Sequence, residues 1–159
     1  MPQNKIKIGL DYHGVIDTNP QYFAEFCSLA RHQGILIYII TGGQGLQIRQ
    51  YLQDIKLEYD FIFSVLDYCY ALGKTTQDAQ GNIRINDEDW NKAKAEFCCQ
   101  NNITLHIDDS NIYQEYFTTC YCLFDKQKNN CQIFKNIKIP FSDNPQDGLA
   151  QIISLLNKL

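Results

Sequence analysis

The chain has 159 residues, and its 18 acidic residues against 14 lysines and arginines give a formal net charge of −4 at pH 7. A chain of this length can bury a sizeable core, so we expect residues 1–159 to form a single domain. The acidic balance disfavours nucleic acid or an anionic membrane surface as a partner, and Lys5 and Lys7 interrupt the apolar stretch near the N-terminus. We therefore expect a cytoplasmic protein without a secretion signal or a transmembrane segment.

Apolar runs and turn residues predict strands that alternate with helices. Strands are predicted at residues 6–10, 35–40, 59–66, 103–107 and 120–124, and a further short strand at 132–134. Helices are predicted at residues 21–34, 44–56 and 87–100, and from Pro145 onward with Asn144 as the N-cap. Residues 71–88 contain two polar, β-compatible arms around a turn signal, which predicts a small hairpin excursion. The alternation favours an α/β fold, with a Rossmann-like parallel sheet flanked by helices.

Seven cysteines are present, an odd number with no CxxC pair. Cys120, Cys122 and Cys131 could supply three zinc ligands, but no fourth ligand is evident in the sequence. In a reducing compartment, small buried thiols are the better interpretation of all seven.

Polar residues follow three predicted core strands at the point where each strand ends. Asp11 follows the first, Thr41 opens a TGG turn after the second, and Asp108 and Asp109 follow a third. Ligands of open α/β sheets bind beyond the carboxyl ends of the strands, so we expect these side chains to meet at one edge. Gly14 suits a turn that requires an unusual backbone angle or a close approach.

Each of these features also has a purely structural explanation, because acids often follow strands and a TGG segment is often only a turn. Their coincidence at one edge favours a functional site. Clustered carboxylates repel one another unless a cation lies between them, and oxygen ligands suit Mg²⁺. The hydroxyl and N–H groups of a TGG turn before a helix can hold an anion. Together they predict a phosphate site with a divalent cation.

The segments GLDYHGVID, IYIITGG and LHIDDS resemble the strand-end motifs of the haloacid dehalogenase-like (HAD) superfamily, over residues from Lys5 to about Ser110. The resemblance implies a Mg²⁺-dependent phosphatase in which Asp11 is the nucleophile and forms an aspartyl-phosphate. It also implies the other site residues. Mg²⁺ would be held by Asp11, the backbone carbonyl of His13, and Asp109 or Asp108, and the phosphoryl group would be bound by Thr41, Gly42, Gly43 and a lysine.

The lysine that the resemblance requires lies before the last acidic strand, where Lys92 and Lys94 both qualify. Lys94 is four residues after Trp90 and three before Phe97, which places it with the apolar face of the predicted helix. We therefore favour Lys94, although a lysine at the edge of the core could simply extend its charge to solvent. Lys74, in the hairpin excursion, is a third and weaker candidate.

His13 stands where the family usually has a second aspartate. That acid protonates the leaving group and then activates water, and an imidazole can do both near neutral pH. Two other functional interpretations are a site that binds or transfers the phosphoryl group but hydrolyses it slowly, and an inactive site that binds metal or ligand only. His13 could also be a surface turn residue without a role.

The spacing of the motifs leaves no room for a large cap domain. The resemblance then implies a phosphorylated substrate that reaches an open site, or an oligomer whose subunits supply the lid. The sequence thus predicts a Mg²⁺-dependent phosphomonoester hydrolase. The alternative is a weak or inactive HAD-like protein that binds phosphate or metal and acts through partner contacts.

Overall fold

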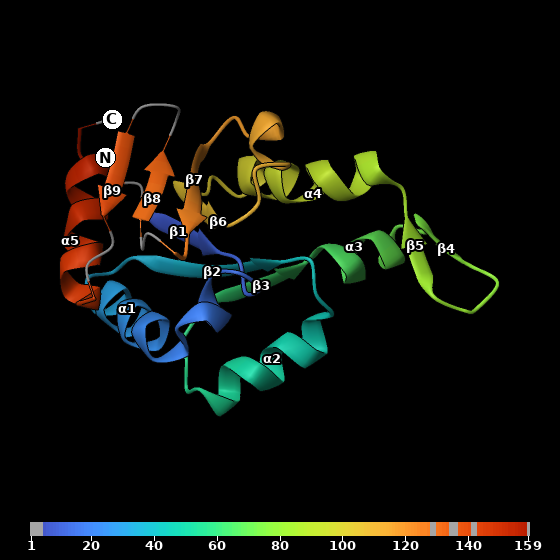
Figure 1. The fold of residues 1–159 in the computed structure, drawn as a ribbon, viewed down its shortest axis with the longest axis horizontal. Coiled ribbons are helices and arrows are strands. Elements are labelled where there is room, and N and C mark those ends of the chain that lie inside the picture. The colour runs from blue at the N-terminus through green and yellow to red at the C-terminus, as the bar shows by residue number, and fades with distance from the viewer. Residues whose placement is uncertain (1–4, 128–129, 134–136, 141–142, 159) are drawn as a thin grey trace.

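The fold is seen in a computed structural model, which describes residues 5–127, 130–133, 137–140 and 143–158. Seven strands form one sheet in the order β3-β2-β1-β6-β7-β8-β9 (Figure 1). Their bounds are β1 Lys7–Leu10, β2 Leu36–Thr41, β3 Phe61–Ser64, β6 Leu105–Asp108, β7 Cys120–Asp125, β8 Asn130–Ile133 and β9 Ile137–Pro140. The first five strands in that order are parallel, and β8 and β9 are antiparallel additions. The predicted parallel, Rossmann-like α/β sheet is therefore confirmed.

The strand register brings the predicted polar residues to one edge. Leu10 pairs with Ile39 of β2 and with Ile107 of β6, so the three central strands end at nearly the same level. From β1 the chain moves outward to β2 and β3, and later returns to place β6 on the other side of β1. The crevice at this reversal is the usual ligand position in such sheets.

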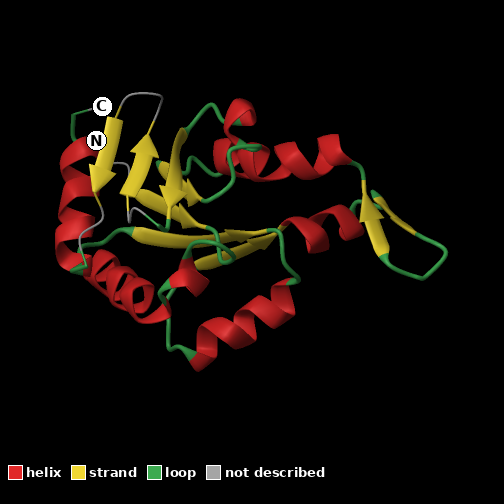
Figure 2. Ribbon diagram, in the orientation of Figure 1, coloured by secondary structure: helices red, strands yellow, loops and turns green. Residues whose placement is uncertain are grey.

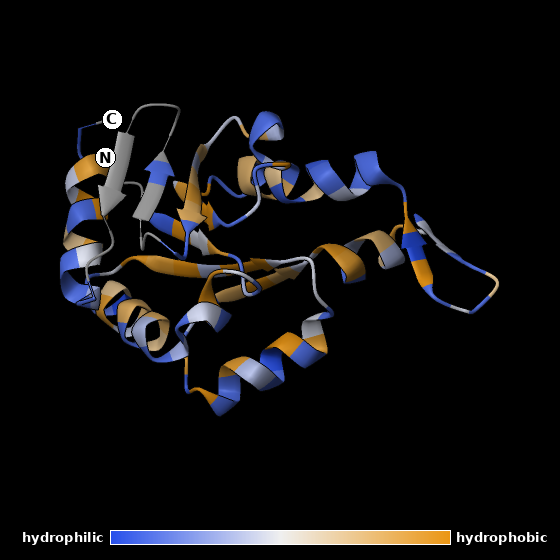
Figure 3. Cartoon of the chain, viewed as in Figure 1, coloured by the Kyte–Doolittle hydropathy of each residue, from blue (hydrophilic) through white to orange (hydrophobic). Residues whose placement is uncertain are grey.

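Helices cover both faces of the sheet (Figure 2). The helices are α1 Pro20–His32, α2 Gly45–Asp54, α3 Val65–Ala71, α4 Asp87–Gln100 and α5 Pro145–Leu156. Residues of α1, α2 and α5 share one hydrophobic core with alternate strand residues such as Ile37 and Ile39. Residues of α3 and α4 share a second core on the opposite face with Tyr38 and Ile40. The apolar strands between these layers are visible in Figure 3.

Side chains cap the starts of α4 and α5, and the cap of α5 was predicted. Asn144 caps α5 by accepting a hydrogen bond from the N–H of Gln146, and Pro145 is the first helical residue. Asn86 caps α4 by accepting from the N–H of Asp89. Acidic residues in the first turn of α4 lie at the positive end of the helix dipole.

The predicted excursion is a two-stranded hairpin, with β4 at Thr75–Gln77 and β5 at Ile83–Ile85. It projects beyond the ends of α3 and α4 (Figure 1). Asp78 organises the turn, because its carboxylate accepts hydrogen bonds from the backbone of Gln80 and Asn82 and from the guanidinium of Arg84. The excursion is shorter than the predicted 71–88, since its ends belong to α3 and α4.

Four elements differ from prediction. Residues 65 and 66 were expected to continue a strand but begin α3, because the Ser64 hydroxyl caps this helix by accepting from the N–H of Asp67. Strand β9 was not predicted. Short 3₁₀ helices at Ile16–Thr18 and Gln114–Tyr116 were not predicted either.

The cysteines agree only in part with the expectation of buried thiols. Cys27, Cys69 and Cys98 are buried free thiols, but Cys99 is exposed and Cys120 is half-buried. Cys122 is disulfide-bonded and is not a thiol. The alternative zinc site also involved Cys131, whose side chain lies outside the described part of the structure.

Within the described residues, no helix combines the length and the apolar character that are needed to cross a membrane.

Candidate functional site

Asp11 is held at the end of β1 by its own backbone. Its N–H donates to the carbonyl of Ile107 at 2.9 Å, which extends the pairing of β1 with β6 by one residue. Its Oδ1 accepts from the N–H of Tyr12 at 2.8 Å, and its side chain is only 9% exposed. The carboxylate is therefore fixed in the crevice.

Lys94 is the cation of the site. It comes from α4, its side chain is only 2% exposed, and its Nζ lies 2.6 Å from Asp108 Oδ2 and 3.0 Å from Asp11 Oδ2. The ammonium also lies 4.9 Å from the ring centre of Tyr113. Lys94 thus joins the acids at the ends of two adjacent strands.

The other two candidate lysines lie elsewhere. Lys92 points to the surface and pairs with Glu88 at 3.3 Å, and Lys74 pairs with Asp89 at 2.7 Å at the base of the hairpin. The prediction from the helical period, that Lys94 points inward and Lys92 outward, is therefore confirmed.

Asp108 and Asp109 have different environments. Asp108 is fully buried, and its carboxylate accepts from Lys94 and His106 at Oδ2 and from the N–H of Ser110 at Oδ1. Asp109 is more exposed and lines the cleft. One oxygen from each of Asp11, Asp108 and Asp109 lies within 4.8 Å of the others. Because Asp108 already accepts three protein hydrogen bonds, Asp109 is the better placed of the two to accept a cation.

Gly14 fits both reasons that were expected for it. Its φ is +79°, in the region that favours glycine, and a Cβ at this position would lie 2.0 Å from Asp109 Oδ2. The absent side chain is what lets the Asp109 carboxylate pack against the turn after β1.

The three carboxylates lie close together around the buried charge of Lys94, and their pKa values reflect this. Burial raises the pKa of Asp11, the charge of Lys94 offsets this only in part, and repulsion from Asp108 adds to it. Burial also raises the pKa of Asp109, with a further contribution from Asp108. For Asp108, the effect of burial is outweighed by the His106 hydrogen bond and the charge of Lys94, so its pKa is well below the usual range. A second cation beside Asp11 and Asp109 would favour the ionised form of both carboxyl groups and so lower their pKa values.

A cleft of about 590 Å³ opens over these groups, within the usual size of a small-molecule site. It is lined by Asp11, His13, Gly14, Gly42, Gly43, Trp90, Lys94, Asp109, Ser110, Tyr113 and Lys126. Trp90 Nε1 donates to the hydroxyl of Tyr113 at 3.1 Å, which joins the two rings into one wall. A Cβ on Gly42 would lie 2.8 Å from the Trp90 ring, so this wall requires glycine in the TGG turn.

Hydrogen bonds within the TGG turn and to residues after it fix its backbone. Thr41 is fully buried and does not line the cleft; its Oγ1 accepts from the N–H of Gly43 at 3.2 Å. The carbonyl of Gly43 accepts from Ser64 Oγ at 2.7 Å, and the N–H of Gly45 donates to Asp67 at 3.1 Å. Of the TGG groups that were expected to hold an anion, the N–H of Gly43 therefore has a protein partner, while Gly42 and Gly43 still line the cleft.

His13 lies at the mouth of the cleft, with its side chain 61% exposed. Its Nδ1 is 3.4 Å from Asp17 Oδ2, and a Cβ on Gly43 would lie 3.5 Å from its Nε2. Asp17 Oδ1 also accepts from the N–H of Gly14 at 2.7 Å. The carboxylate of Asp17 therefore lies beside one ring nitrogen, and the other nitrogen lies beside the TGG turn.

Sequence reasoning missed several groups in or near the site, among them Asp17 and His106. Asp17 is four residues after His13, but only the turn that includes the 3₁₀ helix brings the two together. His106 is fully buried on β6, two residues before Asp108. Strand alternation could have identified it, because residues two apart in a strand share a face.

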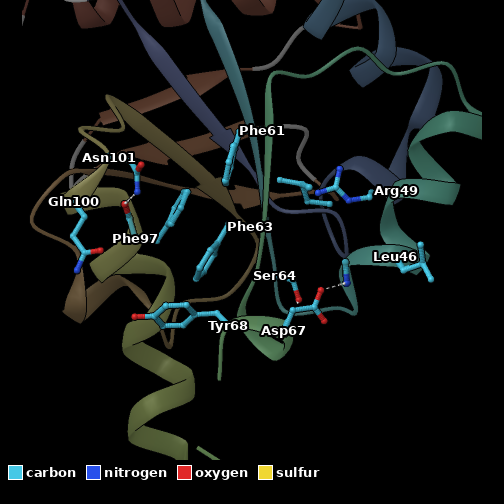
Figure 4. Close-up of a pocket in the computed structure, with 12 residues that line it drawn as sticks. Leu46, Arg49, Phe61, Phe63, Ser64, Asp67, Tyr68, Phe97, Gln100 and Asn101 are labelled. Atoms are coloured by element: carbon cyan, nitrogen blue, oxygen red, sulfur yellow. Dashed lines mark hydrogen bonds between the residues drawn. The ribbon is translucent and has the colours of Figure 1, made fainter. Parts of the chain in front are cut away.

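A larger hollow of about 670 Å³ lies beside the edge strand β3 (Figure 4). Phe61, Phe63 and Phe97 form its stacked aromatic floor, and Asp67 and Ser64 lie at its polar end. This hollow contains none of the clustered titratable groups, so the smaller cleft is the candidate site.

None of the protein-family models matches the chain, and no match was found among the curated proteins.

Proposed function

We propose that the chain is a Mg²⁺-dependent phosphomonoester hydrolase of the HAD type, with Asp11 as the nucleophile. The observation that carries this proposal is the buried contact of Lys94 with Asp11 and Asp108, next to Asp109, at the carboxyl edge of a parallel sheet. The three motifs that resemble the HAD superfamily supply the residues of this edge. Strongly perturbed titratable groups in a cleft are typical of active sites.

The donor set fits Mg²⁺. The clustered ligand atoms are carboxylate oxygens, and three carboxylates face the single positive charge of Lys94. Asp11, Asp109 and the backbone carbonyl of His13 would hold the ion. When bound, Mg²⁺ would neutralise negative charge on the phosphoryl group during transfer.

The residues of the chain account for each proposed step. A carboxylate oxygen of Asp11 attacks phosphorus, the bond between phosphorus and the ester oxygen breaks, and the leaving oxygen takes a proton from His13. His13 then takes a proton from water as the water oxygen attacks the phosphorus of the aspartyl-phosphate. The bond between Asp11 and phosphorus breaks, which releases orthophosphate and restores the carboxylate.

The environment of His13 supports this acid–base role. An orienting carboxylate at one imidazole nitrogen leaves the other nitrogen to exchange protons with the substrate. Asp17 is that carboxylate here, at 3.4 Å from Nδ1. His13 Nε2 is then the nitrogen for the leaving group and the water.

The cleft supports an open site without a large cap. Between β3 and α4 the chain forms only α3 and the small hairpin. The Trp90–Tyr113 wall and Lys126 line the cleft together with the carboxylates of Asp11 and Asp109. A phosphate ester whose leaving group is flat and apolar suits such a wall.

Phosphate release from 4-nitrophenyl phosphate with Mg²⁺ tests the proposal in the wild type and three variants. Asp11→Asn should abolish turnover because it removes the nucleophile. His13→Ala should slow turnover by about 10²–10⁴-fold while Mg²⁺ binding is nearly retained. His13→Asp should keep or raise the rate.

One outcome would favour the alternative of a phosphate-binding protein. If the wild type is no faster than Asp11→Asn while His13→Asp is active, then His13 disables hydrolysis. If none of the four proteins releases phosphate, the hydrolase proposal is wrong.

A further inference from the structure

His106 is a fully buried polar residue that the proposed steps do not use. Leu105 and Ile107 of the same strand belong to the core under α1, α2 and α5. Strand alternation therefore turns His106 and Asp108 toward α4, the helix that carries Lys94. The imidazole lies within the protein beside the charged cluster rather than at the cleft surface.

The hydrogen bond of His106 has a defined direction. Its Nε2 lies 3.0 Å from Asp108 Oδ2, the same oxygen that lies 2.6 Å from Lys94 Nζ. Both oxygens of Asp108 already face groups that can only donate, because Oδ2 accepts from the Lys94 ammonium and Oδ1 accepts from the N–H of Ser110. The proton of this contact is therefore on Nε2, and His106 donates to Asp108.

The ring of His106 is held from several sides. Phe117 stacks on it with ring centres 5.4 Å apart and planes 5° apart, and Tyr121 packs edge-on at 5.9 Å. A Cβ on Gly9 would lie 2.8 Å from His106 Nδ1 and 2.7 Å from Ile40 Cδ1, so glycine in β1 makes room for the ring and for Ile40. Nδ1 is buried without a hydrogen-bond partner in the structure. An apolar residue would avoid that cost, so the donor at Nε2 is what distinguishes histidine here.

We propose that His106 is a positioning residue that acts through Asp108 on Lys94. With His106 at Oδ2 and the N–H of Ser110 at Oδ1, the Asp108 carboxylate is fixed at both oxygens. The fixed carboxylate then holds the Lys94 ammonium in place, 3.0 Å from Asp11 Oδ2. The catalytic part of this inference rests on the proposed hydrolase function; the placement of Lys94 does not.

Two variants distinguish the role of the Nε2–H donor of His106 from the role of ring packing. His106→Gln keeps an N–H donor the same number of bonds from Cβ as Nε2 but loses the ring. His106→Phe keeps a ring that can stack on Phe117 but loses the donor. A positioning role predicts that Gln is tolerated and Phe is not, whereas a packing role predicts the reverse.

The first measurement is the ¹H–¹⁵N correlation of the buried lysine ammonium, assigned by its absence in Lys94→Met. We expect the wild-type signal to persist in His106→Gln. In His106→Phe we expect the signal to shift, or to be lost through faster exchange of the ammonium protons with water. If the Phe variant does not fold, Gly9→Ala is the second perturbation, because the added Cβ crowds the His106 ring as well as Ile40, and it should move the same signal. An unchanged ammonium signal in folded His106→Phe, or in Gly9→Ala if His106→Phe does not fold, overturns the inference.

The second measurement is turnover of 4-nitrophenyl phosphate with Mg²⁺. Displacement of a catalytic group by about 1 Å costs on the order of 10²-fold in rate. We expect His106→Phe to lose about that factor in kcat with little change in KM, and His106→Gln to lose less than about tenfold. Equal losses in both variants overturn the inference. If the wild type hydrolyses nothing while the ammonium signal behaves as expected, the proposed function fails and the placement of Lys94 by His106 stands.

Discussion

Replacing Lys94 by methionine is the sharpest test of the charged cluster. Methionine has a similar length but no charge, so Asp11 and Asp108 are left at 9% and 0% side-chain exposure without their cation. Removal of one partner of a buried ion pair costs about 3–5 kcal/mol in free energy of unfolding. At about 2–4 °C per kcal/mol for a chain of this size, Tm should fall by roughly 6–20 °C.

Lys92→Met is the matched control on the same helix. Lys92 is 30% exposed and pairs with Glu88 on the surface, and such pairs contribute at most about 1 kcal/mol. Thermal denaturation of both variants, followed by circular dichroism without divalent cations, gives the comparison. Adding Asp108→Asn to Lys94→Met should recover part of the lost stability, because one uncompensated carboxylate disappears. Equal stability of the two single variants would refute the reasoning about the buried charges.

Three further predictions concern the turns and the metal. Gly14→Ala should lower Tm more than Gly34→Ala, because both glycines have φ of +79° but only Gly14 would place a Cβ against Asp109. Gly14→Ala should also weaken the stabilisation of the protein by Mg²⁺. Equal effects of the two variants on Tm would count against the close contact with Asp109. Thr41→Val leaves the half-buried N–H of Gly43 without its acceptor and should cost about 0.5–1.5 kcal/mol in urea denaturation, whereas no loss would show that the hydroxyl is dispensable. The pKa values of Asp11 and Asp109 are raised above 3.8, so without metal the folded state holds the protons of these two carboxyl groups more tightly than the unfolded chain does. The contribution of the two groups to the free energy of unfolding therefore falls as pH rises above that value. Mg²⁺ competes with these protons, so the increase in Tm that it causes should grow between about pH 4 and pH 7, and a constant increase would contradict the assignment of ligands.

The parts of the fold that rest on periodicity could be predicted from the sequence. The parallel sheet and the inward direction of Lys94 follow from the repeat of apolar residues in strands and in α4. Helix α3 was missed because Val65 and Leu66 continue an apolar run, and the capping signal of Ser64 before Asp67 was not weighed against that run.

The finer organisation of the site could not be predicted from local pattern. Asp108 and Asp109 are adjacent and chemically identical, and only tertiary contacts bury one and leave the other in the cleft. The sequence indicated that Thr41 would be in the site, but it could not show that the hydroxyl bonds to its own turn. The contact of His13 with Asp17 depends on a turn without a periodic signal.

Trp90 gives the protein a built-in optical probe. It is the only tryptophan in the chain, so excitation near the red edge of protein absorption selects a single indole in the cleft wall. The indole N–H donates to Tyr113, and the Tyr113 ring lies over the Lys94 ammonium. Emission is therefore sensitive both to water in the cleft and to a nearby charge. Occupancy of the cleft by an unlabelled phosphate compound can be followed by titration, without any requirement for turnover.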